Sequence, residues 1–117
     1  MEKRTGKCHC GAVTYEVEID LTQPVVECNC SYCEAQGLLL SFVPGEKLSI
    51  LSGEDNLTEY RFNTEKIQHQ FCKTCGTQCF GRAPMPDGTL GAAINVRTIE
   101  GIDLTKLTRM PFDGRSR

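Results

Sequence analysis

Eight cysteines constrain the fold of this 117-residue chain more than any other feature of its sequence. They form three short motifs and one isolated residue, which are Cys8-x-Cys10, Cys28-x-Cys30-x-x-Cys33, Cys72-x-x-Cys75 and Cys79. The N-terminus has no apolar segment of the kind that directs export, so we expect a cytoplasmic protein in a reducing compartment. In that setting such spacings favour metal ligation over disulfide bonds.

The first and third motifs together offer the ligands of a structural zinc site. A structural zinc takes four ligands in a closed tetrahedron, and each of two short segments usually supplies two of them. A C-x-C pair in an extended segment places both sulfurs on one face, and a C-x-x-C turn can point both sulfurs at one ion. A glycine directly follows each motif and allows the backbone to turn back. The spacing therefore predicts one zinc site on Cys8, Cys10, Cys72 and Cys75.

The second motif places three more ligands, Cys28, Cys30 and Cys33, in one short segment. Three protein ligands with an open fourth position are typical of catalytic zinc. Because sulfur is a soft ligand, a small thiol substrate suits such a site. Cys79 is open to two interpretations, either as a fourth ligand that would make both zincs structural or as a small apolar core residue. We favour the core residue.

Four other polar residues are considered for a role in metal or substrate binding, but their sequence context is less specific. His9 lies between two ligands and would point away from their ion, and His69 is interpreted as a core or surface residue of a strand. Asn95 and Arg97 could hold a substrate carboxylate, although an ordinary surface role is the simpler interpretation. We therefore expect neither histidine to bind metal, and the sequence offers no clear general base.

Alternating apolar and polar residues predict an all-β, mostly antiparallel fold. The expected strands cover residues 12–19, 25–28, 38–43, 48–51, 57–62, 77–81 and 89–96, and residues 67, 69 and 71 share one face before the third motif. No segment has a helical period of useful length. The best helical candidate is one turn over residues 103–107, with Asp103 as its N-cap.

Length and charge narrow the class of protein further. A chain of this length is expected to form a single domain over residues 1–117. The formal net charge is −2 without a basic stripe, so we expect no nucleic-acid partner. Lys3 and Arg4 at one end and Arg115 and Arg117 at the other are interpreted as solvated termini. No apolar run approaches the roughly 20 residues of a membrane span, so we expect no membrane partner.

Several stretches of the chain resemble, in the same order, the motifs of one known family. They are residues 6–15 (GKCHCGAVTY), 28–33 (CNCSYC), 71–77 (FCKTCGT), 94–97 (INVR) and 112–115 (FDGR). The family is that of the glutathione-dependent formaldehyde-activating enzymes, which also includes centromere protein V. The resemblance covers nearly the whole chain, and its three cysteine motifs are its most specific part.

The resemblance implies a zinc-binding β fold of the β-tent type shared with Rab-accessory proteins. It implies a structural zinc on the first and third motifs, and a second, labile zinc on a catalytic group formed by Cys28, Cys30 and Cys33. The activity that it implies is the condensation of formaldehyde with glutathione to S-hydroxymethylglutathione, a carbon–sulfur lyase reaction. Glu34 and Ala35 depart from the family, whose members often carry basic residues after this motif.

Two functions are compatible with the sequence. The first is a zinc-dependent enzyme of carbon–sulfur lyase type, which acts on a small thiol, glutathione or a similar one, and on an aldehyde such as formaldehyde. The alternative is a non-catalytic, zinc-stabilised protein-binding module, which would need an exposed apolar patch. The apolar residues 38–43 could supply that patch, although a buried strand is the favoured interpretation.

Overall fold

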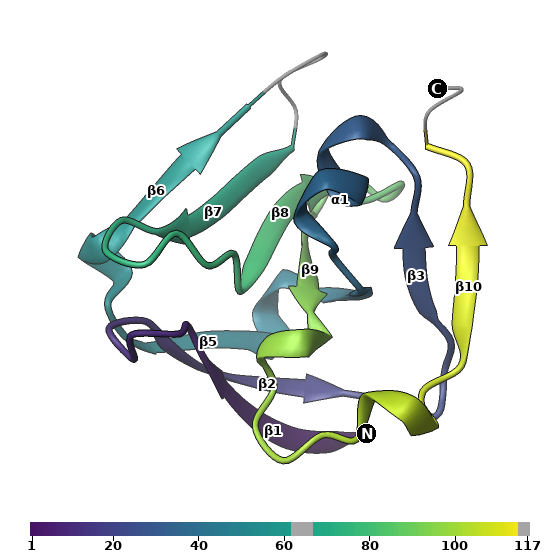
Figure 1. Cartoon of the computed structure of the whole chain (residues 1–117), viewed down its shortest axis with the longest axis horizontal. Coiled ribbons are helices and arrows are strands. Elements are labelled where there is room, and N and C mark those ends of the chain that lie inside the picture. The colour runs from purple at the N-terminus through teal and green to yellow at the C-terminus, as the bar shows by residue number, and fades with distance from the viewer. Residues whose placement is uncertain (62–66, 115–117) are drawn as a thin grey trace.

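Two β-sheets form most of the computed structural model, which describes residues 1–61 and 67–114 (Figure 1). The smaller sheet has the strand order β1-β2-β5, and the larger has the order β10-β3-β4-β9-β8-β7-β6. The strands are β1 (Glu2–Lys7), β2 (Thr14–Ile19), β3 (Val25–Cys28), β4 (Leu40–Pro44), β5 (Leu48–Ser52), β6 (Leu57–Tyr60), β7 (Gln68–Cys72), β8 (Phe80–Pro84), β9 (Leu90–Asn95) and β10 (Arg109–Phe112). Their pairing is antiparallel except between β3 and β10, so the expected mostly antiparallel β fold is confirmed.

The main core lies between the two sheets. In Figure 1 the strands of the smaller sheet run across the lower ends of the larger sheet. Every second residue of β2 faces inward, so that Tyr15, Val17 and Ile19 are fully buried, as the alternation predicts. The Tyr15 ring meets the Phe80 ring edge-on at 5.7 Å between centroids. The Tyr15 hydroxyl and the Thr98 hydroxyl lie 2.6 Å apart, so the buried phenol keeps a hydrogen bond.

The larger sheet also carries apolar residues on its other face. In β9, Ala92 and Ile94 belong to the main core, whereas Ala93 packs with Leu38, Leu40 and the cysteines of the second motif. This alternation follows from the strand geometry, in which successive side chains point to opposite faces. The second motif is therefore positioned on the outer face of the larger sheet, away from the main core.

Helix α1 (Ser31–Gln36) is the main element that the sequence did not predict. Its six residues are too few to show a helical period, and isolated helices of that length are unstable in water. Local capping stabilises it instead. The Cys30 sulfur accepts a hydrogen bond from the Cys33 backbone N–H, and Gly37 ends the helix in the left-handed conformation with φ 69°.

Strands β1 and β10 were also missed, because their sequences do not alternate. β1 includes Lys3 and Arg4, which are therefore residues of an edge strand and not simply a solvated terminus. β10 is exposed along its length and pairs only with β3 among the described strands. Both strands form because their backbones pair with a neighbour whose own pattern is clear.

The remaining expectations need smaller corrections. The strand expected over residues 77–81 begins at Phe80. The strand expected over residues 57–62 ends at Tyr60, and Phe62 lies outside the described residues. Asp103 caps a single turn of 3₁₀ helix over Leu104–Lys106, where its carboxylate accepts from the Thr105 N–H at 3.0 Å, as predicted. Over the described part of the chain, no helix is long and apolar enough to cross a membrane.

Candidate metal centres and active site

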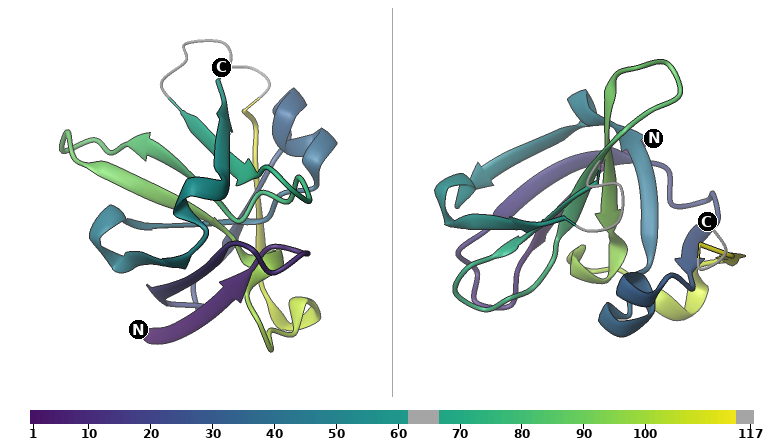
Figure 2. Two further views of the ribbon diagram at one scale, coloured as in Figure 1. Left: turned by 90° about the vertical axis from the view of Figure 1, so that its left-hand side faces the viewer. Right: turned by 90° about the horizontal axis from the view of Figure 1, so that it is seen from above.

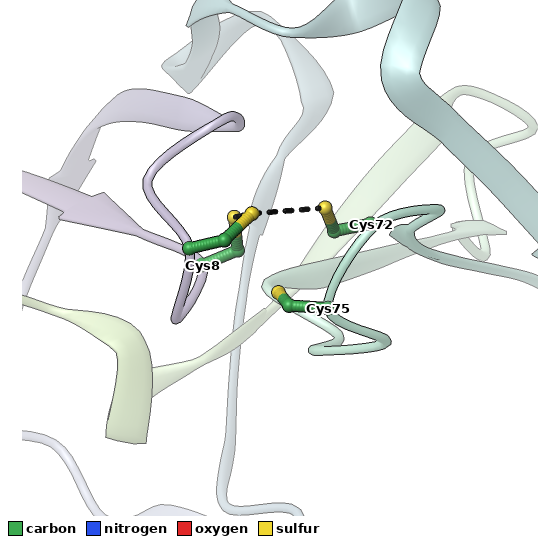
Figure 3. Close-up of side chains that lie close together, drawn as sticks. Cys8, Cys72 and Cys75 are labelled. Atoms are coloured by element: carbon green, nitrogen blue, oxygen red, sulfur yellow. Dashed lines mark hydrogen bonds between the residues drawn. The ribbon is translucent and has the colours of Figure 1, made fainter.

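The turns that follow β1 and β7 bring together a four-cysteine site, formed by Cys8, Cys10, Cys72 and Cys75. All four sulfurs lie within 4.8 Å of one another. The Cys10 sulfur lies 3.6 Å from that of Cys8 and 3.7 Å from that of Cys72. Figure 3 shows the labelled side chains of Cys8, Cys72 and Cys75 converging on one point. The site joins the smaller sheet to the larger one.

Each half of the four-cysteine site is a tight turn closed by a glycine. Gly11 and Gly76 have φ values of 82° and 80°, a conformation that residues with a Cβ rarely adopt. Their N–H groups donate to the carbonyls of Cys8 and Cys72 at 3.1 and 2.9 Å. These turns direct the two sulfurs of each motif to the same side of the backbone.

Hydrogen-bond donors contact two of the four sulfurs. The Val13 N–H donates to the Cys8 sulfur at 3.3 Å, and the Asn56 amide donates to the Cys72 sulfur at 3.4 Å. A hydrogen bond with the Thr77 hydroxyl lowers the pKa of Cys75 to about 5. Several thiolates within 4.8 Å repel one another unless a cation lies among them. The donor set therefore fits a soft divalent metal ion.

A three-cysteine site, formed by Cys28, Cys30 and Cys33, lies where β3 passes into α1. Its sulfurs also lie within 4.8 Å of one another. The Cys30 N–H donates to the Cys28 sulfur at 3.4 Å, and the Cys33 N–H donates to the Cys30 sulfur at 3.3 Å. Burial opposes ionisation of Cys30, but the Cys33 N–H lowers the pKa of its thiol. Burial raises the pKa of Cys33. This group too fits a soft cation.

The C-terminal strand forms one wall of the three-cysteine site. β10 runs parallel to β3 with Phe112 opposite Cys28, and the Asn29 N–H donates to the Phe112 carbonyl at 3.0 Å. Gly114 follows, and a Cβ at this position would collide with the Cys28 sulfur. Both views of Figure 2 place α1 near the end of β10. The sequence motif at residues 112–115 thus contributes to the site, although Arg115 lies outside the described residues.

Cys79 and the two histidines are absent from both cysteine groups, as far as the described residues extend. Cys79 is 1% exposed and packs in the main core, where burial raises its pKa to about 12. It is a core residue, and the alternative in which it completes the three-cysteine site is wrong. His69 is buried, and burial lowers its pKa, so its imidazole is neutral at pH 7.

Two pockets meet at Cys28, and sequence reasoning predicted neither. An apolar pocket of about 400 Å³ covers the outer face of the larger sheet. A mixed pocket of about 500 Å³, called the polar pocket because four charged residues line it, lies on the side of α1. Both are lined by Cys28, Leu38 and Phe112. The three-cysteine site therefore borders one almost wholly apolar pocket and one mixed pocket that also carries charged residues.

Of the two residues considered for a substrate carboxylate, only Arg97 lines the polar pocket. Its Nε donates to the Gly37 carbonyl at 2.8 Å, which fixes the guanidinium beside the end of α1. Asn95 is buried instead, and its amide donates to the Gln78 carbonyl at 2.8 Å. Three acidic residues also line the polar pocket, namely Glu27, Glu34 and Asp113. Glu27 pairs with Arg109 at 3.2 Å.

Tyr32 connects α1 to the strands of the larger sheet. Its hydroxyl donates to the Gln78 side-chain oxygen, and its ring lies 4.2 Å from the His69 ring and 5.5 Å from the Tyr60 ring between centroids. Sequence reasoning gave Tyr32 no role. The only available signal was its place inside the second cysteine motif, because its partners come from distant parts of the chain.

Comparison with known proteins places the chain in a family. The model of the glutathione-dependent formaldehyde-activating enzyme family matches residues 3–104. The chain belongs to this family. It is 33% identical over 84 residues to a curated Talaromyces marneffei protein named "Putative glutathione-dependent formaldehyde-activating enzyme", a match that covers 66% of this chain. Because that match covers 44% of the relative, the chain spans about half the length of this family member.

A crystal structure of a Rhodobacter sphaeroides protein has the same fold. It superposes with a TM-score of 0.79 at 32% sequence identity, and the match covers 92% of this chain and 97% of that chain. The family resemblance inferred from the three cysteine motifs is therefore confirmed by the family match, and the fold is shared with a bacterial protein.

Proposed function

We propose that the chain is a zinc-dependent enzyme of carbon–sulfur lyase type, which joins a small thiol such as glutathione to an aldehyde such as formaldehyde. The three-cysteine site is the proposed catalytic centre, and the four-cysteine site is the proposed structural zinc site. We also propose that residues 1–117 form one domain of the β-tent type. The antiparallel sheets and the four-cysteine site that joins them support this part of the proposal.

The observation that carries the proposal is the position of Cys28 on the shared wall of two pockets. A thiol in one pocket and an aldehyde in the other would both lie beside Cys28, and holding two reactants close together accelerates their reaction. Zinc bound by the three cysteines would supply a cation that favours the thiolate of the substrate. The sulfur then forms a bond to the carbonyl carbon, the C=O π pair moves to oxygen, and that oxygen takes the proton lost by the thiol.

The chain's own groups orient the site for this reaction. The N–H groups of Cys30 and Cys33 hold the neighbouring sulfurs in place. Arg97, fixed by the Gly37 carbonyl, offers a cation to a carboxylate of the thiol substrate in the polar pocket. Gly114 allows the end of β10 to cover the Cys28 sulfur on one side, which limits access of water.

The test is the rate at which glutathione and formaldehyde interconvert with S-hydroxymethylglutathione, measured by NMR exchange spectroscopy. Zinc-loaded wild type should accelerate the exchange, and Cys30→Ser should not. Cys79→Val is the matched control, because it removes a cysteine that belongs to neither site. Equal acceleration by wild type and Cys30→Ser would exclude the three-cysteine site as the catalytic centre.

A protein-binding module is the second candidate, and the exposure of Phe42 favours it. Phe42 is 54% exposed, although Leu38, Leu39, Leu40 and Val43 of the same run are buried. The patch proposed for residues 38–43 is thus reduced to one side chain of β4. Native mass spectrometry separates the candidates. Two zincs with one lost to mild chelation support the enzyme, whereas tight retention of all bound zinc supports the module.

A further inference from the structure

The apolar pocket is larger than formaldehyde requires. Its volume of about 400 Å³ lies in the range of sites that bind small organic molecules. Val26, Leu38, Leu40 and Ala93 line its interior. A one-carbon aldehyde has almost no apolar surface to bury there, so its affinity would gain little from these walls.

Exposed apolar side chains surround the mouth of this pocket. Phe42, Met110 and Phe112 all line it, and they are 54%, 48% and 39% exposed. They come from β4 and β10, which lie on either side of β3 in the larger sheet. Exposure of apolar groups to water is unfavourable in free energy, and a ligand that covers these groups gains binding free energy by removing them from water. The rim therefore favours an elongated apolar ligand over a compact polar one.

The polar groups of the pocket favour an uncharged ligand. Gln78 is already engaged, since its side-chain oxygen accepts from the Tyr32 hydroxyl. His69 is buried and neutral at pH 7 because burial lowers its pKa. Among the described lining residues, Arg82 is the one with a permanently charged side chain, and its guanidinium lies over the Phe80 ring at 5.9 Å.

We propose that this pocket binds the hydrocarbon chain of a longer aldehyde, with the carbonyl group at the Cys28 end. The inference rests on the proposed function and assigns its second substrate to the class of medium-chain aliphatic aldehydes. The product is a hemithioacetal. The thiol sulfur bonds to the carbonyl carbon, the C=O π pair moves to oxygen, and the proton of the thiol ends on that oxygen, so no oxidant or reductant is needed.

The expected signature is an increase of kcat/KM with chain length. Burial of one methylene group contributes up to about fourfold in affinity. Glutathione at a fixed concentration is combined with formaldehyde, acetaldehyde, butanal and hexanal, and the rate of hemithioacetal formation is measured for each. In wild type, kcat/KM should rise from acetaldehyde to hexanal by at least tenfold.

Two variants locate the effect in the pocket. Ala83→Leu adds volume on the wall formed by β8 and should lower the ratio of hexanal to acetaldehyde kcat/KM at least tenfold. Ala35→Leu is the matched control, since the same change falls on an exposed residue of α1 that lines neither pocket. Phe42→Ala changes only the exposed rim, cannot disturb the core, and should lower the same ratio about threefold or more.

A binding measurement separates this inference from the proposed function. Calorimetric titration of 1-hexanol, an unreactive analogue, into the zinc-loaded proteins should give binding to wild type and at least tenfold weaker binding to Ala83→Leu. Turnover of formaldehyde without preference for hexanal, and without hexanol binding, would overturn the inference and leave the proposed function standing. Hexanol binding with no turnover of any aldehyde would overturn the proposed function and the aldehyde assignment with it.

Discussion

Gly114 lies against the sulfur of Cys28, so the segment that follows the last described strand covers the end of the third. No side chain fits between them, because a Cβ on residue 114 would overlap that sulfur and approach the Cys30 Cβ at 3.2 Å. The contact depends on the parallel pairing of β10 with β3, which places Phe112 opposite Cys28. The three-cysteine site thus depends on a distant part of the chain, although all its cysteines come from one motif.

Gly114→Ala should therefore weaken metal binding at the three-cysteine site. Its methyl group displaces Cys28 or the end of β10, and we expect at least tenfold lower affinity for the second zinc, with the melting temperature changed by only a few degrees. Zinc competition with a chromogenic chelator measures the affinity. Arg109→Ala, on the preceding strand β10, is the control, since it removes only a surface ion pair with Glu27. Unchanged affinity in Gly114→Ala would contradict the assigned contact.

Cys72→Ser should unfold the protein or cause it to aggregate. The four-cysteine site connects the two sheets, and structural zinc contributes on the order of 10 kcal/mol to folding in small zinc peptides. Circular dichroism and zinc content by mass spectrometry provide the measurement. A variant that keeps the wild-type melting temperature and its full zinc content would show that Cys72 is not a ligand.

Cys30→Ser should lose one zinc and all thiol binding, yet melt close to wild type. Serine preserves the N-cap of α1, because its hydroxyl can accept the Cys33 N–H that the sulfur now accepts. Cys30→Ala should lose the same zinc and about 1 kcal/mol more stability, since it removes the cap as well. Urea unfolding of the two variants checks this difference. Glutathione binding to Cys30→Ser with wild-type affinity would argue against metal-assisted thiol binding.

Cys79→Val should fold and retain the metal content of wild type. The thiol of Cys79 is buried among apolar residues, and a buried cysteine packs as a small hydrophobic residue. Its raised pKa of about 12 leaves roughly one thiolate in ten thousand at pH 8, so iodoacetamide should modify Cys79 only after unfolding. Peptide mass mapping of native and denatured protein measures the modification. Loss of one zinc from Cys79→Val would show that Cys79 is a metal ligand.

Glu34→Arg should strengthen the binding of glutathione severalfold. Glu34 lines the polar pocket with two further acids, and the negative net charge of glutathione is repelled there. The gain should shrink between 10 mM and 500 mM salt, because ions screen the interaction. Glu46→Arg makes the same charge change at a residue that lines neither pocket. If calorimetry gives equal gains for both variants, the effect comes from net charge and not from the pocket.

The sequence predicted those parts of the molecule that depend on local patterns. The alternation in β2 placed Tyr15 and Val17 inside correctly, and the cysteine spacings grouped the sulfurs that lie together. β1 and β10 were missed because edge strands form through backbone pairing and need no apolar alternation. α1 was missed because its six residues are too few to show a helical period, and its ends are fixed by caps at Cys30 and Gly37.

The pockets could not be predicted for a different reason. The apolar pocket is lined from β3, β4, β7, β8, β9 and β10, so it can be located only once the order of strands in the larger sheet is known. In the sequence, Leu40 and Phe42 belong to one apolar run. No local pattern distinguishes them from Leu39, which faces the main core. The close approach of Gly114 to Cys28 is equally non-local.

The four-cysteine site also has a consequence for how the chain reaches its native state. Cys10 and Cys72 are 62 residues apart in sequence, and their sulfurs come within 3.7 Å. Closing so long a loop is entropically costly and slows folding. A metal ion that first binds the two cysteines of one turn can fix the conformation of that turn. When the other turn then binds the same ion, the two sheets are brought together. With the proposed zinc in the four-cysteine site, the folding rate should depend on the supply of free zinc during synthesis. Zinc scarcity should then cause newly made chains to aggregate, while chains that have already folded persist.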